Sequence, residues 1–283
     1  MVPTKQNALK PAHRLTFEQH FVPVPDGLIH YAEVANDRPP MLLVHGIGMD
    51  WRVWQAISRW LTPFFHLYLL DLRGHGESFK PQHGYRLADY AADVEDVLEA
   101  LQLEGATLVG SSLGAMVTLA VEAPPDMVSY RILADPPLTG GPVRDTQMFH
   151  EILKLKHQPV PALAKFLAER NPGMGAFLSR AMSEMWHEAS DGVITDMLSD
   201  SRHYNDLAAS LGEDLSPTLV MQADQTKGGV LTDDGARRAL ELLPYGSFVH
   251  FEGAGHAIHA YQPEKFTRQI LKFTGTRTRA DSA

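Results

Sequence analysis

The sequence predicts an α/β fold with a mostly parallel sheet flanked by helices and an inserted helical cap. Short apolar and β-branched runs alternate with segments of helical period along most of the 283 residues. That alternation is typical of a parallel sheet covered by helices. From residue 137 to residue 215 it stops, and helical segments broken by Pro and Gly follow one another. We therefore expect a core at residues 1–136 and 216–283 and a cap at residues 137–215.

The expected strands are short runs of about strand length. The first two of them should form an antiparallel pair through the turn Pro25–Asp26–Gly27, because Pro presets φ, Asp bonds its own backbone and Gly accepts positive φ. In chain order, the strands are expected at Glu18–Val24, Leu28–Val34, Met41–Val44, His66–Leu70, Ala106–Val109, Tyr130–Leu133, Thr218–Gln222 and Ser247–Phe251.

The expected helices are segments whose apolar residues are spaced to form one helical face. In the core they are Trp51–Leu61, Leu87–Leu101, Leu113–Glu122, Asp234–Leu243 and Pro263–Phe273, and in the cap Thr146–Leu155, Pro161–Ala168, Met174–Trp186 and Ala189–Asp200.

Composition excludes several classes of function. Apolar residues make up 44% and charged residues 21% of the chain, which is ordinary globular usage. The net charge of -9 disfavours a nucleic-acid partner. The absence of cysteine excludes disulfides and thiolate metal sites. No secretory segment is evident, and the longest apolar stretch, Ala106–Ala123, contains Gly, Ser and Thr and suits a strand, turn and helix better than a membrane span. We expect a cytoplasmic protein without a membrane partner; its oligomeric state is not predicted.

Ser112 is the candidate nucleophile. It lies in the run Gly110–Ser111–Ser112–Leu113–Gly114, between an expected strand and an expected helix. In that context a G-x-S-x-G run predicts a sharp turn that exposes the serine at the end of the sheet, with small residues on both sides because strand and helix approach closely. The alternative is a Gly- and Ser-rich turn that carries no chemistry.

A serine nucleophile needs a base, and the base needs a carboxylate that orients it. The candidate base is His256, which directly follows the last expected strand; His259 is the second choice and is expected to pack nearby. Asp224 and Asp135 each follow an expected strand. We favour Asp224 as the acid, because the chain order Ser, acid, His is usual for this turn and Asp224 sits one strand before the histidine. Asp135 is the alternative.

The oxyanion of an acyl-transfer intermediate needs hydrogen-bond donors. The backbone amide of Leu113, directly after the serine, is one candidate. The amide of Ile47 in the run His45–Gly46–Ile47–Gly48 is the other, because this run also follows an expected strand. An ordinary glycine turn is an equally good interpretation of this run taken alone.

Five features in this order resemble the α/β-hydrolase superfamily: HGIG at residue 45, DLRGHGES at residues 71–78, GSSLG at residue 110, Asp224 and GAGH at residue 253. The resemblance spans roughly residues 18–275. It implies an eight-stranded sheet whose second strand is antiparallel, a triad of Ser112, His256 and Asp224, a pocket under the cap, and no cofactor or metal. It also implies a structural role for the loop at residues 71–78.

The leading hypothesis is a serine hydrolase that cleaves a carboxylic ester or lactone of an apolar small molecule. Trp186, Met182 and Phe149 of the cap are the candidate substrate-binding residues. A serine at position 112 disfavours the members of this fold that use an aspartate nucleophile. A carbon-carbon bond hydrolase or perhydrolase with the same triad, and a ligand-binding member without catalysis, remain alternatives.

Overall fold

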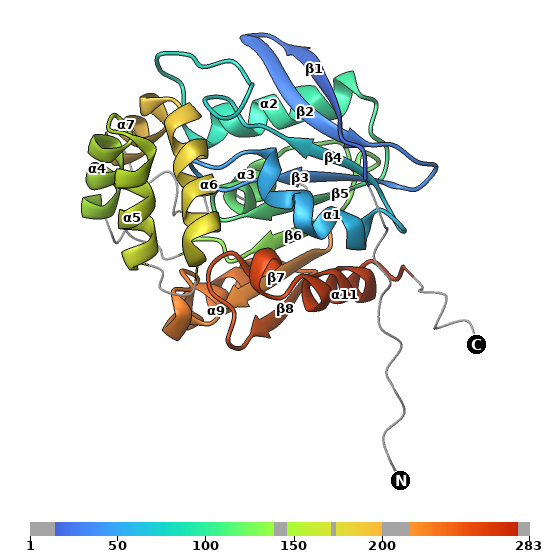
Figure 1. The fold of residues 1–283 in the computed structure, drawn as a ribbon. Coiled ribbons are helices and arrows are strands. Elements are labelled where there is room, and N and C mark those ends of the chain that lie inside the picture. The colour runs from blue at the N-terminus through green and yellow to red at the C-terminus, as the bar shows by residue number, and fades with distance from the viewer. Residues whose placement is uncertain (1–14, 139–145, 171–173, 200–215, 277–283) are drawn as a thin grey trace.

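The computed structural model describes residues 15–138, 146–170, 174–199 and 216–276, and its centre is one eight-stranded sheet (Figure 1). The strand order is β1-β2-β4-β3-β5-β6-β7-β8. β2 is antiparallel to β1 and β4, and every other pair is parallel. The predicted mostly parallel sheet is confirmed. Its strands are β1 (Glu18–Val24), β2 (Gly27–Val34), β3 (Pro40–Val44), β4 (His66–Leu70), β5 (Ala106–Ser111), β6 (Val128–Ala134), β7 (Thr218–Ala223) and β8 (Gly246–Phe251).

Helices cover both faces of the sheet and bury two apolar clusters. Strand side chains alternate between the faces, so Leu42 of β3 joins one cluster while Leu43 joins the other. Helices α2 (Leu87–Ala100), α3 (Leu113–Ala120) and α9 (Asp233–Leu242) cover the first cluster, and α1 (Gln55–Leu61), α10 (Ile258–Tyr261) and α11 (Pro263–Phe273) cover the second. Short 3-10 turns, η1 (Trp51–Trp54) and η3 (Gln225–Lys227), follow β3 and β7.

Among the described residues, four helices lie between β6 and β7 and stand to one side of the sheet (Figure 1). They are α4 (Thr146–Leu155), α5 (Val160–Arg170), α6 (Gly175–Glu188) and α7 (Asp191–Ser199). The turn between α6 and α7 is joined to the core, because the Ser190 N–H donates to the Gly74 carbonyl at 2.7 Å. Asp196 adds a second join: its carboxylate accepts from the Gly84 and Tyr85 amides, both at 3.2 Å. The rest of the predicted cap, residues 139–145, 171–173 and 200–215, lies outside the described residues.

The two glycines of the serine turn permit a close approach of backbones in the core. A Cβ atom on Gly110 would lie 2.1 Å from the Gly114 carbonyl oxygen, and one on Gly114 would lie 2.1 Å from the Val44 carbonyl oxygen. Helix α3 therefore packs with its first turn against the backbones of β3 and β5, which no larger residue would permit. This contact determines where the helix begins and where Ser112 lies.

The far end of α3 is held by a buried arginine. Arg131 of β6 is 2% exposed, and its guanidinium donates to the carbonyls of Thr118 and Val121 at the end of the helix. The carbonyls at a helix C-terminus carry partial negative charge and lack intrahelical donors. The arginine supplies both the hydrogen-bond donors and a compensating positive charge. Both ends of the helix that follows Ser112 are therefore fixed to the sheet.

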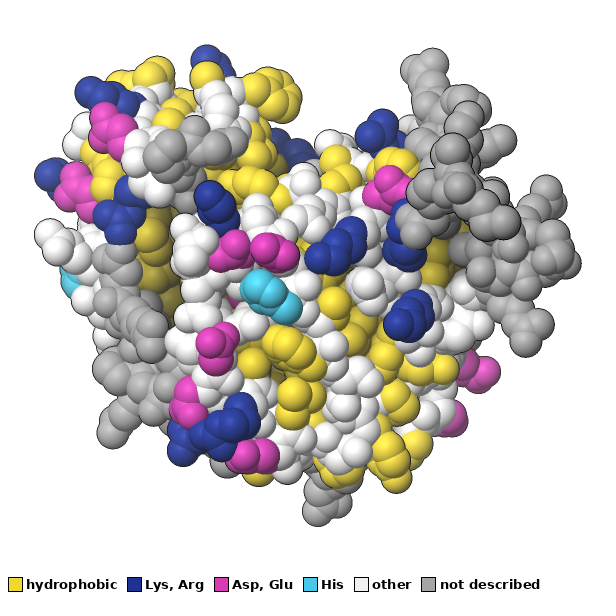
Figure 2. Space-filling model, turned by 90° about the horizontal axis from the view of Figure 1, so that it is seen from below, with side chains coloured by type: hydrophobic (Ala, Val, Ile, Leu, Met, Phe, Trp, Pro, Cys, Tyr) yellow, Lys and Arg dark blue, Asp and Glu magenta, His cyan; other side chains and the backbone are white. Residues whose placement is uncertain are grey.

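The two edge strands of the sheet are protected in different ways. β1 contains Glu18 and Pro23, residues that discourage pairing with another strand. β8 carries no charged residue, but the Lys265 ammonium of α11 donates to the His250 carbonyl at 3.3 Å. Figure 2 views the molecule from the side of α9, β8 and α11 and shows hydrophobic side chains interspersed with charged ones. Over the described residues, no helix combines the length and apolar character that crossing a bilayer requires.

Replacing Gly114 by alanine is expected to destabilise the fold by about 3 kcal/mol or more, because backbone atoms of β3 occupy the space of the new methyl group. Urea unfolding followed by circular dichroism measures the loss. Gly175→Ala is the control: Gly175 has φ +71° and nothing within 4 Å of the added Cβ, so only backbone strain of about 1–2 kcal/mol is expected. An equal loss in both variants would contradict the close approach.

Candidate active site

Ser112 occupies the strained turn between β5 and α3. Its φ and ψ are 55° and -116°, a region that costs a non-glycine residue on the order of 1–3 kcal/mol. The surrounding hydrogen bonds hold this conformation: the Ser112 N–H donates to the Ala134 carbonyl at 3.0 Å, and the Ser112 carbonyl accepts from the amides of Ala115 and Met116 at 3.0 and 3.2 Å. Its side chain is only partly buried, as a nucleophile that meets a substrate must be.

Asp135 follows β6 directly beside Ser112. Ser111 and Ala134 are aligned in the parallel pair of β5 and β6, so Ser112 and Asp135 are the next residues on adjacent strands, which lie about 4.8 Å apart. Asp135 also has a positive φ, 47°, and its side chain is fully buried. The structure therefore places a buried carboxylate beside the candidate nucleophile.

Four hydrogen bonds compensate the burial of the Asp135 carboxylate. Oδ1 accepts from the amides of Ala223 and Leu231 at 3.1 and 3.2 Å, and Oδ2 accepts from the Val230 amide at 2.8 Å. The fourth donor is His256, whose Nδ1 lies 2.6 Å from Oδ2. Buried charges require such donors to offset desolvation. Three of the four come from the backbone at the end of β7 and in the segment that follows it.

The bond to Asp135 defines the state of His256. Because a carboxylate accepts, Nδ1 carries the proton, and a neutral imidazole then has its lone pair on Nε2. The His256 side chain is 36% exposed, so this face can meet a substrate. A histidine oriented by a buried carboxylate, where that carboxylate follows the strand next to the serine turn, is an arrangement suited to activating a hydroxyl for nucleophilic attack.

The preference for Asp224 as the partner of His256 is wrong: the structure pairs His256 with the alternative, Asp135. The Asp224 carboxylate instead accepts from the Thr226 hydroxyl at 2.6 Å, from the Thr226 amide at 2.9 Å and from the Gly253 amide at 2.9 Å. The Thr226 hydroxyl, followed by the Gly253 amide, holds the pKa of Asp224 below its ordinary value. Asp224 thus caps η3 and braces the loop that carries His256.

Two backbone amides near Ser112 are available as donors. Leu113 begins α3, so its N–H belongs to the first turn, which has no intrahelical acceptor. On the other side, a Cβ on Gly46 would lie 3.2 Å from the Ser112 Cβ and 3.8 Å from its Oγ. The Gly46–Ile47 turn therefore lies against the serine side chain, and Ile47 is only partly buried.

Of the three candidate substrate-binding residues, Trp186 lies against the loop beside the serine. A Cβ on Gly48 would come within 2.2 Å of the Trp186 ring, so the indole packs directly on the backbone one residue beyond Ile47. Phe149 meets Trp186 edge-on with ring centroids 6.4 Å apart, and Met182 packs against the same apolar cluster. The described residues thus place an aromatic wall beside the Gly46–Ile47–Gly48 turn.

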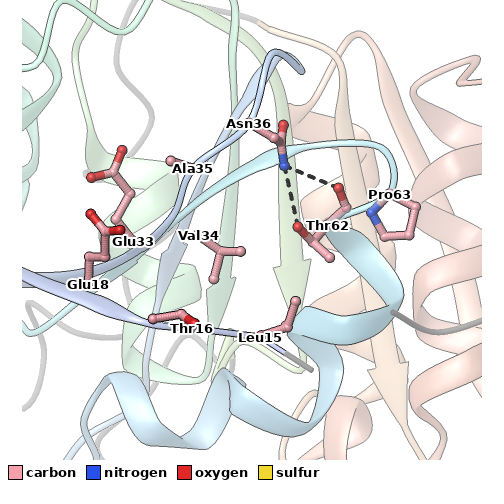
Figure 3. A pocket seen from close by; sticks show the side chains of 9 residues that line it. All are labelled: Leu15, Thr16, Glu18, Glu33, Val34, Ala35, Asn36, Thr62 and Pro63. Carbon is pink, nitrogen blue, oxygen red and sulfur yellow. Dashed lines mark hydrogen bonds between the residues drawn. The ribbon is translucent and has the colours of Figure 1, made fainter. Parts of the chain in front are cut away.

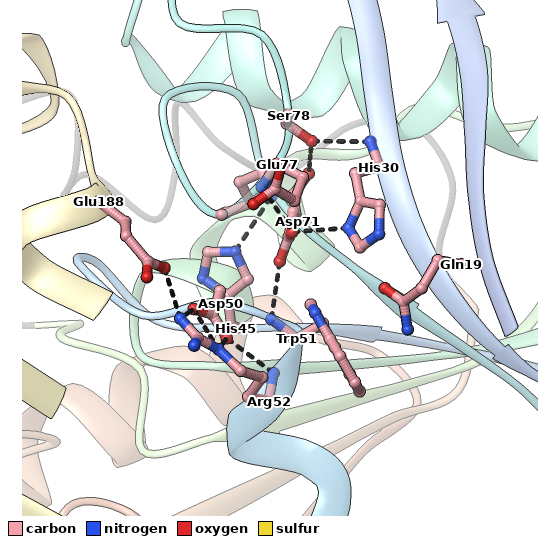
Figure 4. Close-up of polar contacts among 12 residues, drawn as sticks. Gln19, His30, His45, Asp50, Trp51, Arg52, Asp71, Glu77, Ser78 and Glu188 are labelled. Carbon is pink, nitrogen blue, oxygen red and sulfur yellow. Dashed lines mark hydrogen bonds and ion pairs between the residues drawn. The ribbon is translucent and has the colours of Figure 1, made fainter. Parts of the chain in front are cut away.

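An ion pair joins helix α6 to the segment that follows β3. In Figure 4, the Arg52 guanidinium lies between the carboxylates of Asp50 and Glu188, each at 2.5 Å. Asp50 is buried and caps η1, whereas Glu188 is the last residue of α6. The exposed fractions of Arg52 and Glu188, 35% and 46%, make their pair weak by itself. The ion pair and the packing of Trp186 on Gly48 together hold α6 against the loop that follows β3.

His259, the second choice for the base, is buried in the core. Its ring packs against Trp54 with centroids 4.4 Å apart and against Phe266 at 6.1 Å. Burial and, to a smaller extent, the charge of nearby His256 lower the pKa of His259 to about 3. A neutral imidazole enclosed in this way contributes packing, as the sequence predicted.

A cavity lies at the amino ends of β3 and β4 (Figure 3). Its volume is about 470 Å³, and Asn36 and Pro63, which precede β3 and β4, help to line it. Ligands of open parallel sheets bind at the carboxyl ends of the strands, where Ser112 and Asp135 lie. Within the described ranges, no three His, Asp or Glu side chains converge in a way that would hold a metal ion.

A serine in a strained strand-to-helix turn, next to a buried aspartate that binds a histidine at the carboxyl edge of this sheet, is typical of the class of α/β hydrolases. The chain belongs to the Alpha/beta hydrolase family, whose model matches residues 41–269.

Three comparisons indicate how similar known proteins are to this chain. An uncharacterized protein, Rv2715 of Mycobacterium tuberculosis, is 34% identical over 88% of this chain and 79% of its own length. The 2-(acetamidomethylene)succinate hydrolase of Mesorhizobium japonicum is 27% identical over 83% of this chain and 87% of its own. The crystal structure of a putative aryl esterase from Burkholderia cenocepacia superposes with a TM-score of 0.76 at 21% identity, covering 91% and 98% of the two chains; at that identity it supports the fold alone.

His259→Leu is expected to flatten the acid side of the stability profile. Between pH 6.5 and 3 the unfolded chain protonates this histidine and the folded chain does not, so the stability of the wild type falls as pH decreases through this window. Each such histidine adds a slope of about 1.4 kcal/mol per pH unit. Urea unfolding at pH 4, 5 and 6 measures the slope, and His83→Leu, at an exposed site, is the control. Equal slopes in the wild type and His259→Leu would contradict the prediction.

Proposed function

We propose that the protein is a serine hydrolase that cleaves a carboxylic ester or lactone of an apolar small molecule through an acyl-enzyme. The observation that carries the proposal is the pairing of His256 with buried Asp135, one strand away from the strained Ser112. A strained serine alone is compatible with a structural turn. A base with a fixed tautomer beside it is a requirement of nucleophilic catalysis.

In the proposed reaction the Ser112 Oγ attacks the carbonyl carbon while Nε2 of His256 takes the hydroxyl proton. Asp135 stabilises the imidazolium that forms and keeps the ring oriented through Nδ1. The imidazolium then protonates the leaving alcohol, which completes the acyl-enzyme. In the second half, His256 takes a proton from water, the resulting hydroxide attacks the acyl carbon, and the proton returns to Ser112.

The amides of Leu113 and Ile47 are the proposed donors to the oxyanion. Both are backbone groups on either side of the serine, so they need no reorganisation when negative charge develops on the substrate oxygen. Removing one donor of this kind typically costs about 10²–10³ in kcat.

The aromatic wall beside the oxyanion loop supports an apolar substrate. Trp186 packs on Gly48, and Phe149 packs on Trp186. Apolar pockets with a few convergent polar groups are typical of small-molecule sites. We propose that Trp186 contacts the substrate directly, and that Phe149 and Met182 act through it.

Hydrolysis of an amide bond is a second candidate, favoured by one relative. The Mesorhizobium japonicum protein is named for a substrate that contains an acetamido group. The same serine, histidine and aspartate would serve, with His256 protonating a leaving amine. Comparing p-nitrophenyl acetate with p-nitroacetanilide, which transfer the same acyl group, distinguishes the two once each kcat/KM is divided by the rate constant for alkaline hydrolysis of the same compound. A larger ratio for the ester supports the leading proposal, and a larger ratio for the anilide supports the second.

Ser112→Ala is expected to abolish turnover of p-nitrophenyl acetate and butyrate, because the covalent intermediate cannot form. Labelling the wild type with a fluorophosphonate and mapping the adduct by mass spectrometry should identify Ser112. Ser111→Ala, at the neighbouring buried position, is the matched control and should keep the label. An adduct at another residue, or equal turnover by Ser112→Ala, would refute the mechanism.

Asp135→Asn is expected to lower kcat by about 10⁴ with the same esters, because the amide no longer holds the correct histidine tautomer. Asp224→Asn should stay within about tenfold of the wild type, since Asp224 braces only the backbone of the histidine loop. Steady-state kinetics on both variants, with circular dichroism to verify folding, make the comparison. A loss of kcat that is larger in Asp224→Asn than in Asp135→Asn would identify Asp224 as the acid.

A further inference from the structure

Two buried histidines, His45 and His75, hold the loop that carries the Ile47 amide, and the proposed mechanism gives neither of them a role. We propose that both are positioning residues, which aim the Ile47 N–H at the oxyanion by fixing the peptide groups on either side of Ile47. This inference rests on the proposed function, because it assumes that Ile47 supplies a donor.

His45 fixes the peptide group that precedes Ile47. Its Nδ1 lies 2.8 Å from the Gly46 carbonyl oxygen, which also accepts from the Met49 amide at 3.2 Å. The Gly46 carbonyl and the Ile47 N–H belong to the same planar trans peptide and point in opposite directions. Two donors on the carbonyl therefore determine the direction of the N–H. Within the described residues, no hydrogen bond occupies the Ile47 N–H.

His75 fixes the peptide group that follows Ile47. The Gly48 amide donates to Nε2 of His75 at 3.0 Å, and Nδ1 of His75 lies 2.9 Å from the Arg73 carbonyl oxygen. His75 thus joins the loop after β3 to the loop after β4. On its other side Gly48 is covered by the Trp186 ring, so the end of the turn is held between an imidazole and an indole.

The hydrogen bonds require one protonation state of both rings. Each Nδ1 faces a carbonyl and must carry the proton, whereas each Nε2 accepts from a backbone amide, Leu72 for His45 and Gly48 for His75. The rings are fully buried, with centroids 4.9 Å apart. Burial lowers the pKa of both, that of His75 to about 3, so they stay neutral and keep their acceptor atoms over the working range of pH.

The loop cannot replace a lost histidine contact by moving Gly46. Gly46 is confined by the Ser112 side chain, because a Cβ there would approach the Ser112 Cβ to 3.2 Å. A shift of the Ile47 peptide would thus follow directly from loss of either imidazole, and a displacement of about 1 Å at a catalytic group costs about 10²-fold in rate.

The test compares an apolar and a conservative substitution at each histidine. His75→Leu removes the acceptor for the Gly48 amide, whereas His75→Gln offers an amide oxygen in place of Nε2. His45→Leu removes the donor to Gly46, whereas His45→Asn offers an amide N–H in place of Nδ1. We expect the leucine variants to lose about 10²-fold in kcat with KM within about threefold of the wild type, and the amide variants to recover most of that loss.

A second measurement separates positioning from general damage. A trifluoromethyl ketone forms a hemiketal oxyanion with an active serine, so its inhibition constant should weaken in parallel with kcat/KM across the four variants. The matched control is His30→Gln: His30 is equally buried and binds Asp71, but no hydrogen bond joins its side chain to the Gly46–Gly48 turn. It should lose thermal stability while keeping kcat.

Three outcomes would overturn the inference: leucine variants that keep the wild-type kcat, variants that change KM alone, or a His30→Gln variant that loses kcat as strongly as His75→Leu. Failure of the proposed function is distinguishable from these, because the wild type itself would then neither turn over an ester nor carry a fluorophosphonate on Ser112.

Discussion

The close approach of helix α3 to the backbones of β3 and β5 is the constraint on which the rest of the site depends. Gly110 and Gly114 leave no space for a methyl group between these elements, and Ser112 is forced into its left-handed conformation between them. The strain is offset by burial, by the backbone bonds of Ser112 and by the hold of Arg131 on the far end of α3. The proposed nucleophile is therefore positioned by packing alone, independently of His256 and Asp135.

The fold was predictable because its signals are local. Strands such as Glu18–Val24 and His66–Leu70 and the helix Pro263–Phe273 have the expected bounds, since a buried strand needs a continuous apolar run and an amphipathic helix needs a 3.6-residue period. The turn at Ser112 was predictable for the same reason: its two glycines lie within five residues. The helix α10, which follows His256, was not predictable, because its four residues are too few to show a helical period.

The choice between Asp135 and Asp224 depended on contacts between distant residues. Both follow a strand and both lie between Ser112 and His256 in the chain, and Asp224 was favoured because it sits one strand before the histidine. The deciding facts are three-dimensional: the amides of Ala223, Val230 and Leu231 converge on Asp135, whereas Thr226 lies two residues from Asp224 and captures it locally. A Thr two positions after an Asp is a sequence signal for such a local turn, and it was the one available hint that Asp224 would face its own backbone.

The hydrogen bonds of Asp135 give this side chain two roles. The carboxylate orients His256, and it also gathers the backbone that runs from the end of β7 toward α9. In the proposed mechanism a substitution there is expected to lower activity and stability together, unlike the many active-site changes that exchange one for the other. A variant with its acid at another position would therefore also need another anchor for the β7–α9 connection.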